Sequence, residues 1–217
     1  MEKFTRLTAI AAPLRRINID TDIIIPSREM KRVSKQGLGE GLFAGWRYRE
    51  PGSREENPDF ILNQEPYRRA RIILAGANFG CGSSREHAVW ALYEWGIRCI
   101  IAPSFGAIFR GNCVRNGILP VVLDDAVIER LAEQVMADPQ RAQLTVDLET
   151  CQVIAADGEA HAFDIAPGDR RMLLEGLDAI AATLEHAEDI LEFQARDRLR
   201  RPWVYLDSAE TTPSASS

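Results

Sequence analysis

Short apolar runs alternate with amphipathic segments through the middle of the chain. Three apolar runs have the length and composition of buried strands: 71–75, 97–102 and 120–123. Between them, apolar residues recur at three- and four-residue spacing over 88–95 and 105–115, as they do on one face of a helix. A third amphipathic segment begins at Asp124 or Asp125. This order of strands and helices predicts parallel βαβ units with right-handed crossovers.

The two ends of the chain show other patterns. Alternating apolar residues over 4–10 predict an opening strand. Three more short strands are expected late in the chain: 144–148, 152–155 and 160–165. Asp157 and Gly158 predict a hairpin turn between the last two of these. Residues 169–200 then return to helical spacing.

No repeat or low-complexity linker divides the chain. We therefore expect one α/β domain over 1–206, in which a mixed sheet combines parallel βαβ units with short antiparallel strands. A tail of small polar residues, 207–217, is expected to be disordered. Residues 27–41 are basic and end in three glycines, so they form either a mobile loop that closes over a site or an ordinary exposed helix. Residues 45–70 are expected to form an irregular surface excursion.

One stretch, 76–88, joins the first predicted strand to the first predicted helix. Its three glycines let the backbone turn sharply and leave room for a ligand, and they are Gly76, Gly80 and Gly82. The first amides of a helix lack partners within the helix and carry partial positive charge, so they attract anions. Arg85 adds a cation whose planar fork suits a carboxylate, and the hydroxyls of Ser83 and Ser84 lie nearby. The stretch predicts a site for an anionic substrate.

Other interpretations of this stretch stay open. A nucleotide site is weakly supported, because neither a P-loop ending nor G-x-G-x-x-G is present. No G-x-S-x-G surrounds Ser83, so an esterase is also weakly supported. Ser83, with Glu86 three residues later, has the form of a capping box, which would be purely structural. We interpret His87 as a packing residue and not as a catalytic base.

Composition excludes several functional classes. Apolar residues make up 46% of the 217 residues, which is enough for a substantial core. A net charge of −6 argues against a general nucleic-acid binder. No apolar run has the length of a membrane helix, and the N-terminus has no signal-peptide pattern. A cytoplasmic location is expected.

The four cysteines are widely separated in the sequence: Cys81, Cys99, Cys113 and Cys151. None belongs to a C-x-x-C pair, so the chain by itself offers neither a zinc site nor an iron–sulfur site, and no metal is expected in it. We expect Cys99, Cys113 and Cys151 to be buried free thiols. Cys81 lies in the glycine-rich stretch, but a thiol without a placed base is a poor nucleophile.

The stretch from Gly80 to Ala88 resembles the signature of the swivelling domain of the aconitase superfamily. More narrowly, the chain is similar to the small-subunit family of 3-isopropylmalate dehydratases. The resemblance covers most of residues 4–206 in the expected order. The other segments that carry it are 13–14, 18–26, 42–48, 59–63, 100–105, 116–120, 174–178 and 183–186.

The resemblance implies a hydro-lyase that dehydrates a 2-hydroxy dicarboxylate and rehydrates the alkene at the neighbouring carbon. In leucine biosynthesis this interconverts 2-isopropylmalate and 3-isopropylmalate through 2-isopropylmaleate. It implies that Ser83 is the base, acting as an alkoxide, and that Asp22 orients the serine or the arginine of the signature. Arg85 and Ser84 would hold a substrate carboxylate. The remaining candidates for substrate binding are Thr21, Arg28, Lys31 and Arg32.

The resemblance also implies a partner. This chain has no cluster ligands, so a 4Fe-4S cluster, the Lewis acid for the departing hydroxyl, would be carried by a large subunit. The active site would then lie between the two chains. We expect a heterodimer, or a dimer of heterodimers, in which this chain alone is inactive, and we expect no nucleic-acid or membrane partner.

Three positions depart from the family pattern. Ala107 stands where an aspartate is usual, Gly111 lies in a segment that is usually aromatic–Asn–Asn, and Val89 stands where proline is common. Two alternatives therefore stay open. One is the small subunit of a related dehydratase, of the homoaconitase or dimethylmalate type, and the other is a non-catalytic anion-binding paralogue.

Overall fold

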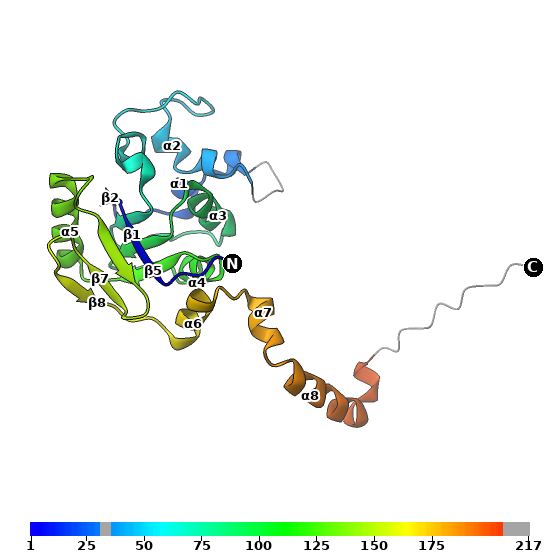
Figure 1. Ribbon diagram of the computed structural model, residues 1–217. Coiled ribbons are helices and arrows are strands. Elements are labelled where there is room, and N and C mark those ends of the chain that lie inside the picture. Colours follow the sequence, from blue (N-terminus) through cyan, green and yellow to red (C-terminus); the bar gives the residue numbers. More distant parts are fainter. Residues whose placement is uncertain (31–35, 206–217) are drawn as a thin grey trace, which may run out of the picture. The chain divides into compact units, whose positions relative to one another are not determined.

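The protein is described by a computed structural model over residues 1–30 and 36–205. The chain divides into two compact units, Met1–Asp178 and Ala179–Ser217. The first unit contains two four-stranded sheets and six helices, α1 to α6, within its described residues (Figure 1). The predicted boundaries of one domain over 1–206 stay a prediction, and the tail from 207 onward lies outside the described residues.

The first sheet is entirely parallel and holds all three of the strands predicted in the middle of the chain. Its order is β2-β3-β4-β5, at Ala11–Leu14, Ile72–Ala75, Cys99–Ala102 and Leu119–Val122. Three longer helices follow these strands: α3 at Glu86–Trp95, α4 at Ala107–Arg115 and α5 at Asp125–Ala137. Figure 1 shows α3 and α5 on opposite sides of the sheet. The predicted parallel βαβ units are confirmed.

The second sheet is antiparallel and has the order β1-β6-β7-β8. Its strands are Arg6–Ala9, Leu144–Asp147, Gln152–Ile154 and Ala160–Ala162. The predicted turn before β8 is present, since the Gly158 amide donates to the Ala155 carbonyl at 3.0 Å and the Asp157 carboxylate accepts from the Glu159 amide at 2.9 Å. The α/β class with parallel units and antiparallel strands is confirmed, and the two kinds of strand form separate sheets.

The opening segment is two strands and not one. β1 pairs with β6 in the antiparallel sheet, whereas β2 pairs with β3 in the parallel sheet, so the chain changes sheet at Ile10. A periodicity of two does not reveal this change, because both strands bury alternate or successive apolar residues. Pro13 is tolerated in β2 because that strand lies at the edge of its sheet, where a missing amide breaks no ladder.

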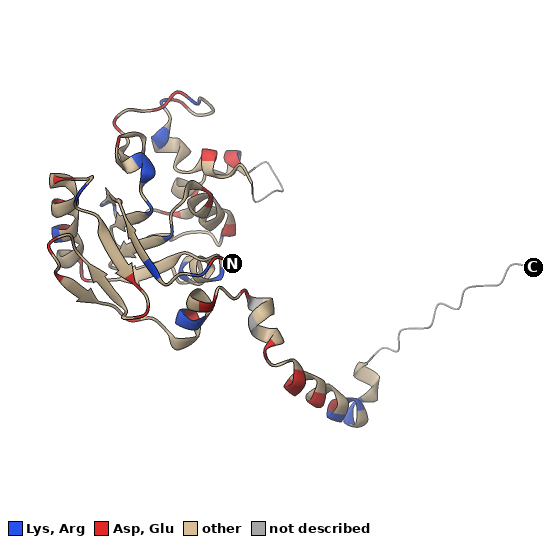
Figure 2. Ribbon diagram, in the orientation of Figure 1, with Lys and Arg blue, Asp and Glu red and all other residues tan. Residues whose placement is uncertain are grey.

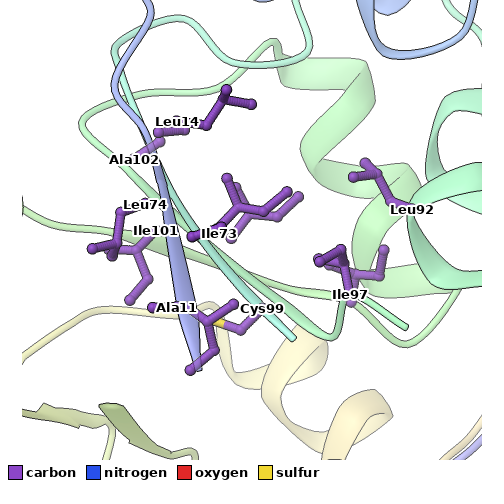
Figure 3. Packing of buried hydrophobic residues seen from close by; sticks show 14 of the residues in the cluster. Ala11, Leu14, Ile73, Leu74, Leu92, Ile97, Cys99, Ile101 and Ala102 are labelled. Carbon is purple, nitrogen blue, oxygen red and sulfur yellow. The ribbon is translucent and has the colours of Figure 1, made fainter. Parts of the chain in front are cut away.

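The core is built on the parallel sheet, whose two central strands are buried on both faces. All four residues of β3 and all four of β4 are buried. Ile73 lies on the side of the sheet that faces Leu92 of α3 and Ile97, whereas Leu74 and Ile101 lie together on the other side (Figure 3). These strands therefore read as continuous apolar runs without alternation, as expected for a parallel sheet covered by helices.

The described residues of 21–30 and 36–70 form more regular structure than predicted, and the prediction for the basic stretch 27–41 lies partly outside the described residues. The described part contains two four-residue helices, α1 at Thr21–Ile24 and α2 at Ala44–Arg47, and short 3-10 turns at Ser27–Glu29, Gly39–Gly41, Ile61–Asn63 and Tyr67–Arg69. Residues 45–70 are not only a surface excursion, because Arg47 and Asn63 are buried within them. The Arg47 guanidinium lies over the Trp95 ring at 4.3 Å and donates to the Gly39 carbonyl at 2.9 Å. Buried polar contacts of this kind leave no periodic signal.

The predicted helical stretch 169–200 is three helices. In the first unit, α6 spans Pro167–Glu175 and ends at Gly176, whose positive φ of 71° terminates it. In the second unit, α7 spans Ala179–Leu184 and α8 spans Ala187–Arg200. Figure 2 shows the acidic residues of α8 near its start and the basic ones near its end. Among the described residues, no helix combines the length and apolar character that a membrane crossing requires.

Candidate active site

The candidate site lies where the loops that follow β2, β3 and β4 meet, at the carboxyl edge of the parallel sheet. Two isolated parallel bridges join these loops, one between Asp20 and Cys81 and the other between Phe79 and Phe105. The Gly80 amide also donates to the Ile19 carbonyl at 2.7 Å. Ligand sites of open parallel sheets form at this edge, because the loops diverge there and leave a crevice.

Gly80 and Gly106 are required by close contacts within the protein. A Cβ at Gly80 would lie 2.1 Å from Cγ of Phe109, and a Cβ at Gly106 would lie 2.5 Å from the Gly80 carbonyl oxygen. Gly80 also has a φ of 71°, in the left-handed region. The side of Gly80 on which a Cβ would project is filled by the Phe109 ring, and Gly80 itself lines the cavity described below.

Thr21 holds the serine-bearing loop through two hydrogen bonds. Its amide donates to the Cys81 carbonyl at 3.0 Å, and its hydroxyl donates to the Ser83 carbonyl at 2.8 Å. Thr21 is only 2% exposed. Its hydroxyl is thus engaged with the backbone of the loop, although Thr21 also borders the cavity described below. Substrate contact by Thr21 stays a prediction.

Ser83 and Ser84 precede α3 and do not cap it. The helix begins at Glu86, and its N-cap is Arg85, whose side chain makes no capping hydrogen bond. The purely structural capping box of Ser83 and Glu86 is therefore wrong. Both serines are exposed, at the end of the loop that Thr21 holds.

Arg85 forms a charged hydrogen bond with Asp22, which lies in the first turn of α1. One guanidinium nitrogen, Nη1, donates to the Asp22 carboxylate. The Arg85 side chain is 23% exposed and that of Asp22 is 53% exposed. Asp20 has a separate role, since its carboxylate accepts from the Ile23 amide at 2.7 Å and caps α1. The structure thus brings Asp22 to Arg85, as the sequence-based hypothesis requires.

A cavity of about 260 Å³ lies beside these residues. Four of the predicted site residues line it: Thr21, Ser83, Ser84 and Arg85. The opposite wall is the first turn of α4 with its preceding residue, from Gly106 to Ile108. The free amides of this turn add partial positive charge. The sequence predicted this second helix over 105–115 but did not predict that its start forms part of the site.

A second depression, of about 420 Å³, includes Asp22 in its lining. It is lined by Asp20, Asp22, Ile23, Pro26, Ser27, Arg28, Gly45 and Trp46. Arg28 thus lines a depression that shares Asp22 with the Arg85 pair, and its Nε lies 3.5 Å from the Glu29 carboxylate. Lys31 and Arg32 lie outside the described residues, so their part in substrate binding stays a prediction.

The cysteines do not gather at the site. Cys99 and Cys113 are completely buried, and burial raises the pKa of both thiols far above the ordinary value. Cys151 is half-buried, so the expectation that it is a buried thiol is wrong. Within the described part of the chain, no three His, Cys, Asp or Glu side chains are grouped so as to hold a metal ion. These thiols do not fit an iron–sulfur cluster.

His87 packs against an aromatic ring of its own helix. Its ring centroid lies 4.9 Å from that of Trp90, with the ring planes 58° apart. This contact agrees with the interpretation of His87 as a packing residue.

Comparison with protein families first defines the class to which this fold and site belong. Residues 1–126 match the aconitase C-terminal domain, and residues 129–167 match the family model described as LeuD_N. Residues 180–206 match the C-terminal domain of the 3-isopropylmalate dehydratase small subunit. The first of these matches includes the whole of the candidate site. The fold is thus of the aconitase type.

Individual relatives indicate which family within the aconitase class the chain belongs to. The chain is 60% identical over 207 residues to a 3-isopropylmalate dehydratase small subunit of Cupriavidus necator, covering 95% of this chain and 100% of that protein. It is 52% identical to the protein of the same name from Rhodospirillum centenum, covering 94% of this chain and 99% of the relative. The chain belongs to the 3-isopropylmalate dehydratase small subunit family.

A solved structure supports the fold. A crystal structure of 3-isopropylmalate dehydratase from Methanocaldococcus jannaschii matches with a TM-score of 0.61 and 23% sequence identity, covering 87% of this chain and 99% of that one. At this identity the likeness shows that the two chains share the aconitase-type arrangement.

Proposed function

We propose that this chain supplies the base and the carboxylate-binding groups of a hydro-lyase that interconverts 2-isopropylmalate and 3-isopropylmalate through 2-isopropylmaleate. The observation that carries the proposal is the convergence of Ser83, Ser84 and Arg85 on one cavity beside the start of α4. The family membership supports the choice of substrate. In this proposal the chain works in the cytoplasm.

Ser83 is proposed as the base that removes the proton beside a substrate carboxylate. A serine hydroxyl is a weak base in water, so the site must stabilise its alkoxide. The Arg85 cation and the free amides at the starts of α3 and α4 provide positive potential around the cavity. These groups are part of the folded chain, so they need no reorganisation when charge develops.

Arg85 and Ser84 are proposed to bind one carboxylate of the substrate. Asp22 accepts a hydrogen bond from Arg85 and thereby limits where the guanidinium points. Arg28, in the neighbouring depression, is placed to meet the second carboxylate. These two cations would hold a dicarboxylate across the boundary between the two depressions, with the reacting carbon near Ser83. We also retain Lys31 and Arg32 as candidates for this second contact.

A large partner subunit is proposed to carry the 4Fe-4S cluster, which would act as the Lewis acid for the departing hydroxyl. Support comes from the exposed rim of the cavity and from the second unit of the chain. Within its described residues, that unit has seven exposed large apolar side chains: Ile180, Leu184, Leu191, Phe193, Leu199, Trp203 and Val204. Apolar groups on this scale are typical of a surface that a partner covers.

The test is reconstitution of activity from separate chains. The purified chain is expected to show no turnover alone and to gain turnover when mixed anaerobically with a large dehydratase subunit. Turnover by the chain alone would contradict the proposal. Because Ala107 lines the cavity and is one of the three departures from the family pattern, the substrate panel should include homoaconitate and dimethylmalate. If the enzyme turns over one of these compounds faster than isopropylmalate, that compound is the substrate and not isopropylmalate.

Replacement of Arg85 by lysine tests the carboxylate contact. Lysine keeps the charge but loses the planar fork, so it can form only one directed bond to a carboxylate. We expect KM for isopropylmalate to rise roughly 10- to 100-fold in Arg85→Lys, as for a lost charged hydrogen bond of about 1.5–3 kcal/mol. Arg69→Lys, at an exposed position on the 3-10 turn Tyr67–Arg69, is the matched control and should leave KM unchanged. Normal kinetics in Arg85→Lys would remove Arg85 from the site.

A further inference from the structure

We propose that Asn116 is a positioning residue that holds the Glu86 carboxylate away from Arg85 and so keeps the guanidinium available to an anionic substrate. Asn116, at the end of α4, contacts the first two turns of α3. This role of Asn116 rests on the proposed function, because that function gives Arg85 its substrate.

The Asn116 side chain uses both halves of its amide. Its Nδ2 donates to Glu86 Oε1 at 2.9 Å and to the Asn112 carbonyl at 2.9 Å. Its Oδ1 accepts from the indole nitrogen of Trp90 at 3.0 Å. Glu86 and Trp90 are four residues apart on α3, so they lie on the same face of the helix. Reversal of the amide would replace all three bonds with unfavourable pairs, which fixes its orientation.

Because of its position, the Glu86 carboxylate can compete with the substrate for Arg85 in the proposed site. Glu86 is the first residue of α3, next in sequence to Arg85, and it carries the same charge as the substrate. The positive end of a helix attracts carboxylates, and a released Glu86 would be drawn toward the start of α3 and toward the guanidinium. There it would compete with a substrate carboxylate.

Asn116 suits this task because it is neutral. An arginine or lysine at position 116 would also bind Glu86, but it would add a positive charge next to the start of α3. An amide restrains the carboxylate by hydrogen bonds alone. Arg85 is then left with Asp22, on α1, as its charged partner.

The alternative role for Asn116 is a simple tie between two helices, and three variants separate the two roles. Asn116→Ala releases Glu86, and we expect KM for isopropylmalate to rise two- to fivefold, the range typical of an exposed charge pair, while kcat changes less than twofold. Glu86→Gln removes the charge and keeps the oxygen that accepts from Asn116, so its KM should equal or fall below that of the native enzyme. In the double variant the released side chain is neutral, and KM should return to the Glu86→Gln value.

The double variant decides between the roles. If Asn116 only ties the helices, the double variant will have the same raised KM as Asn116→Ala, and the proposal is overturned. Gln134→Ala is a matched control, because Gln134 also donates from an amide to a carboxylate, that of Asp157, at 2.8 Å between α5 and the turn before β8. It should not change KM.

A second measurement needs neither partner nor substrate. The Nε–H resonance of Arg85, assigned by its loss in Arg85→Lys, should shift in Asn116→Ala and return toward its native position in the double variant. An unchanged resonance would overturn the proposal even if the reconstituted enzyme had a different substrate. Conversely, a shifted resonance without isopropylmalate turnover would reject the proposed function and leave the role of Asn116 supported.

Discussion

Replacement of Ser83 by alanine is expected to reduce turnover of the reconstituted enzyme by roughly 10²- to 10⁴-fold, the usual contribution of a positioned base. The serine is exposed on a loop whose backbone is held by Thr21, so removal of one oxygen leaves that loop in place. KM should change little, because Arg85 and Ser84 still bind the carboxylate. The measurement is steady-state kinetics with the large subunit in excess.

Ser84→Ala is the matched control for this loss. It removes an adjacent hydroxyl from the same cavity, but one that is proposed to bind and not to react. We expect it to raise KM by less than about tenfold, as for one hydrogen bond, and to preserve most of kcat. Turnover of Ser83→Ala within a factor of ten of the native enzyme would show that another group removes the proton.

Replacement of Gly80 by alanine is expected to cause a large loss of stability, larger than the same replacement at Gly82 or Gly45. Its Cβ would lie 2.1 Å from Cγ of Phe109, which is 3% exposed and packs against Phe79 with ring centroids 5.5 Å apart. The Phe109 ring therefore has little room to move. Overpacking and the left-handed φ of 71° together predict a loss of about 2–5 kcal/mol in the free energy of unfolding. This corresponds to a decrease in Tm of roughly 4–20 °C.

Alanine replacements at two other glycines, Gly82 and Gly45, serve as controls for the stability loss expected at Gly80. Gly82 has a φ of 89°, but its nearest contact would be 3.3 Å from the added Cβ, so Gly82→Ala should cost only the backbone strain of about 1–2 kcal/mol. Gly45, within α2, has no atom within 4 Å of an added Cβ, so Gly45→Ala should be neutral or slightly stabilising. Thermal unfolding followed by circular dichroism would rank the three variants. A Gly80→Ala protein as stable as Gly45→Ala would refute the packing argument.

The parallel sheet could be predicted from the sequence because its signal is local. A strand buried on both faces must be apolar throughout, and a helix that covers it must be apolar on one side, so β3, α3, β4, α4 and β5 are each visible in a short window of residues. The change of sheet at Ile10 and the burial of Arg47 were missed. Both depend on partners far along the chain, which no local period records.

By itself, the sequence determined the α/β class, the strand–turn–helix that carries Ser83, Ser84 and Arg85, and the family to which those residues point. These follow from local spacing and from residue chemistry, both of which are present in the linear chain. Only the tertiary structure decided that Asp22 meets Arg85 and that the start of α4 forms the second wall of the cavity. It alone also decided that Gly80 makes room for Phe109 and that Asn116 is hydrogen-bonded to Glu86. The physical reason is that each of these contacts joins separate loops or helices, which come together only when the parallel strands align and bring their following loops to one edge.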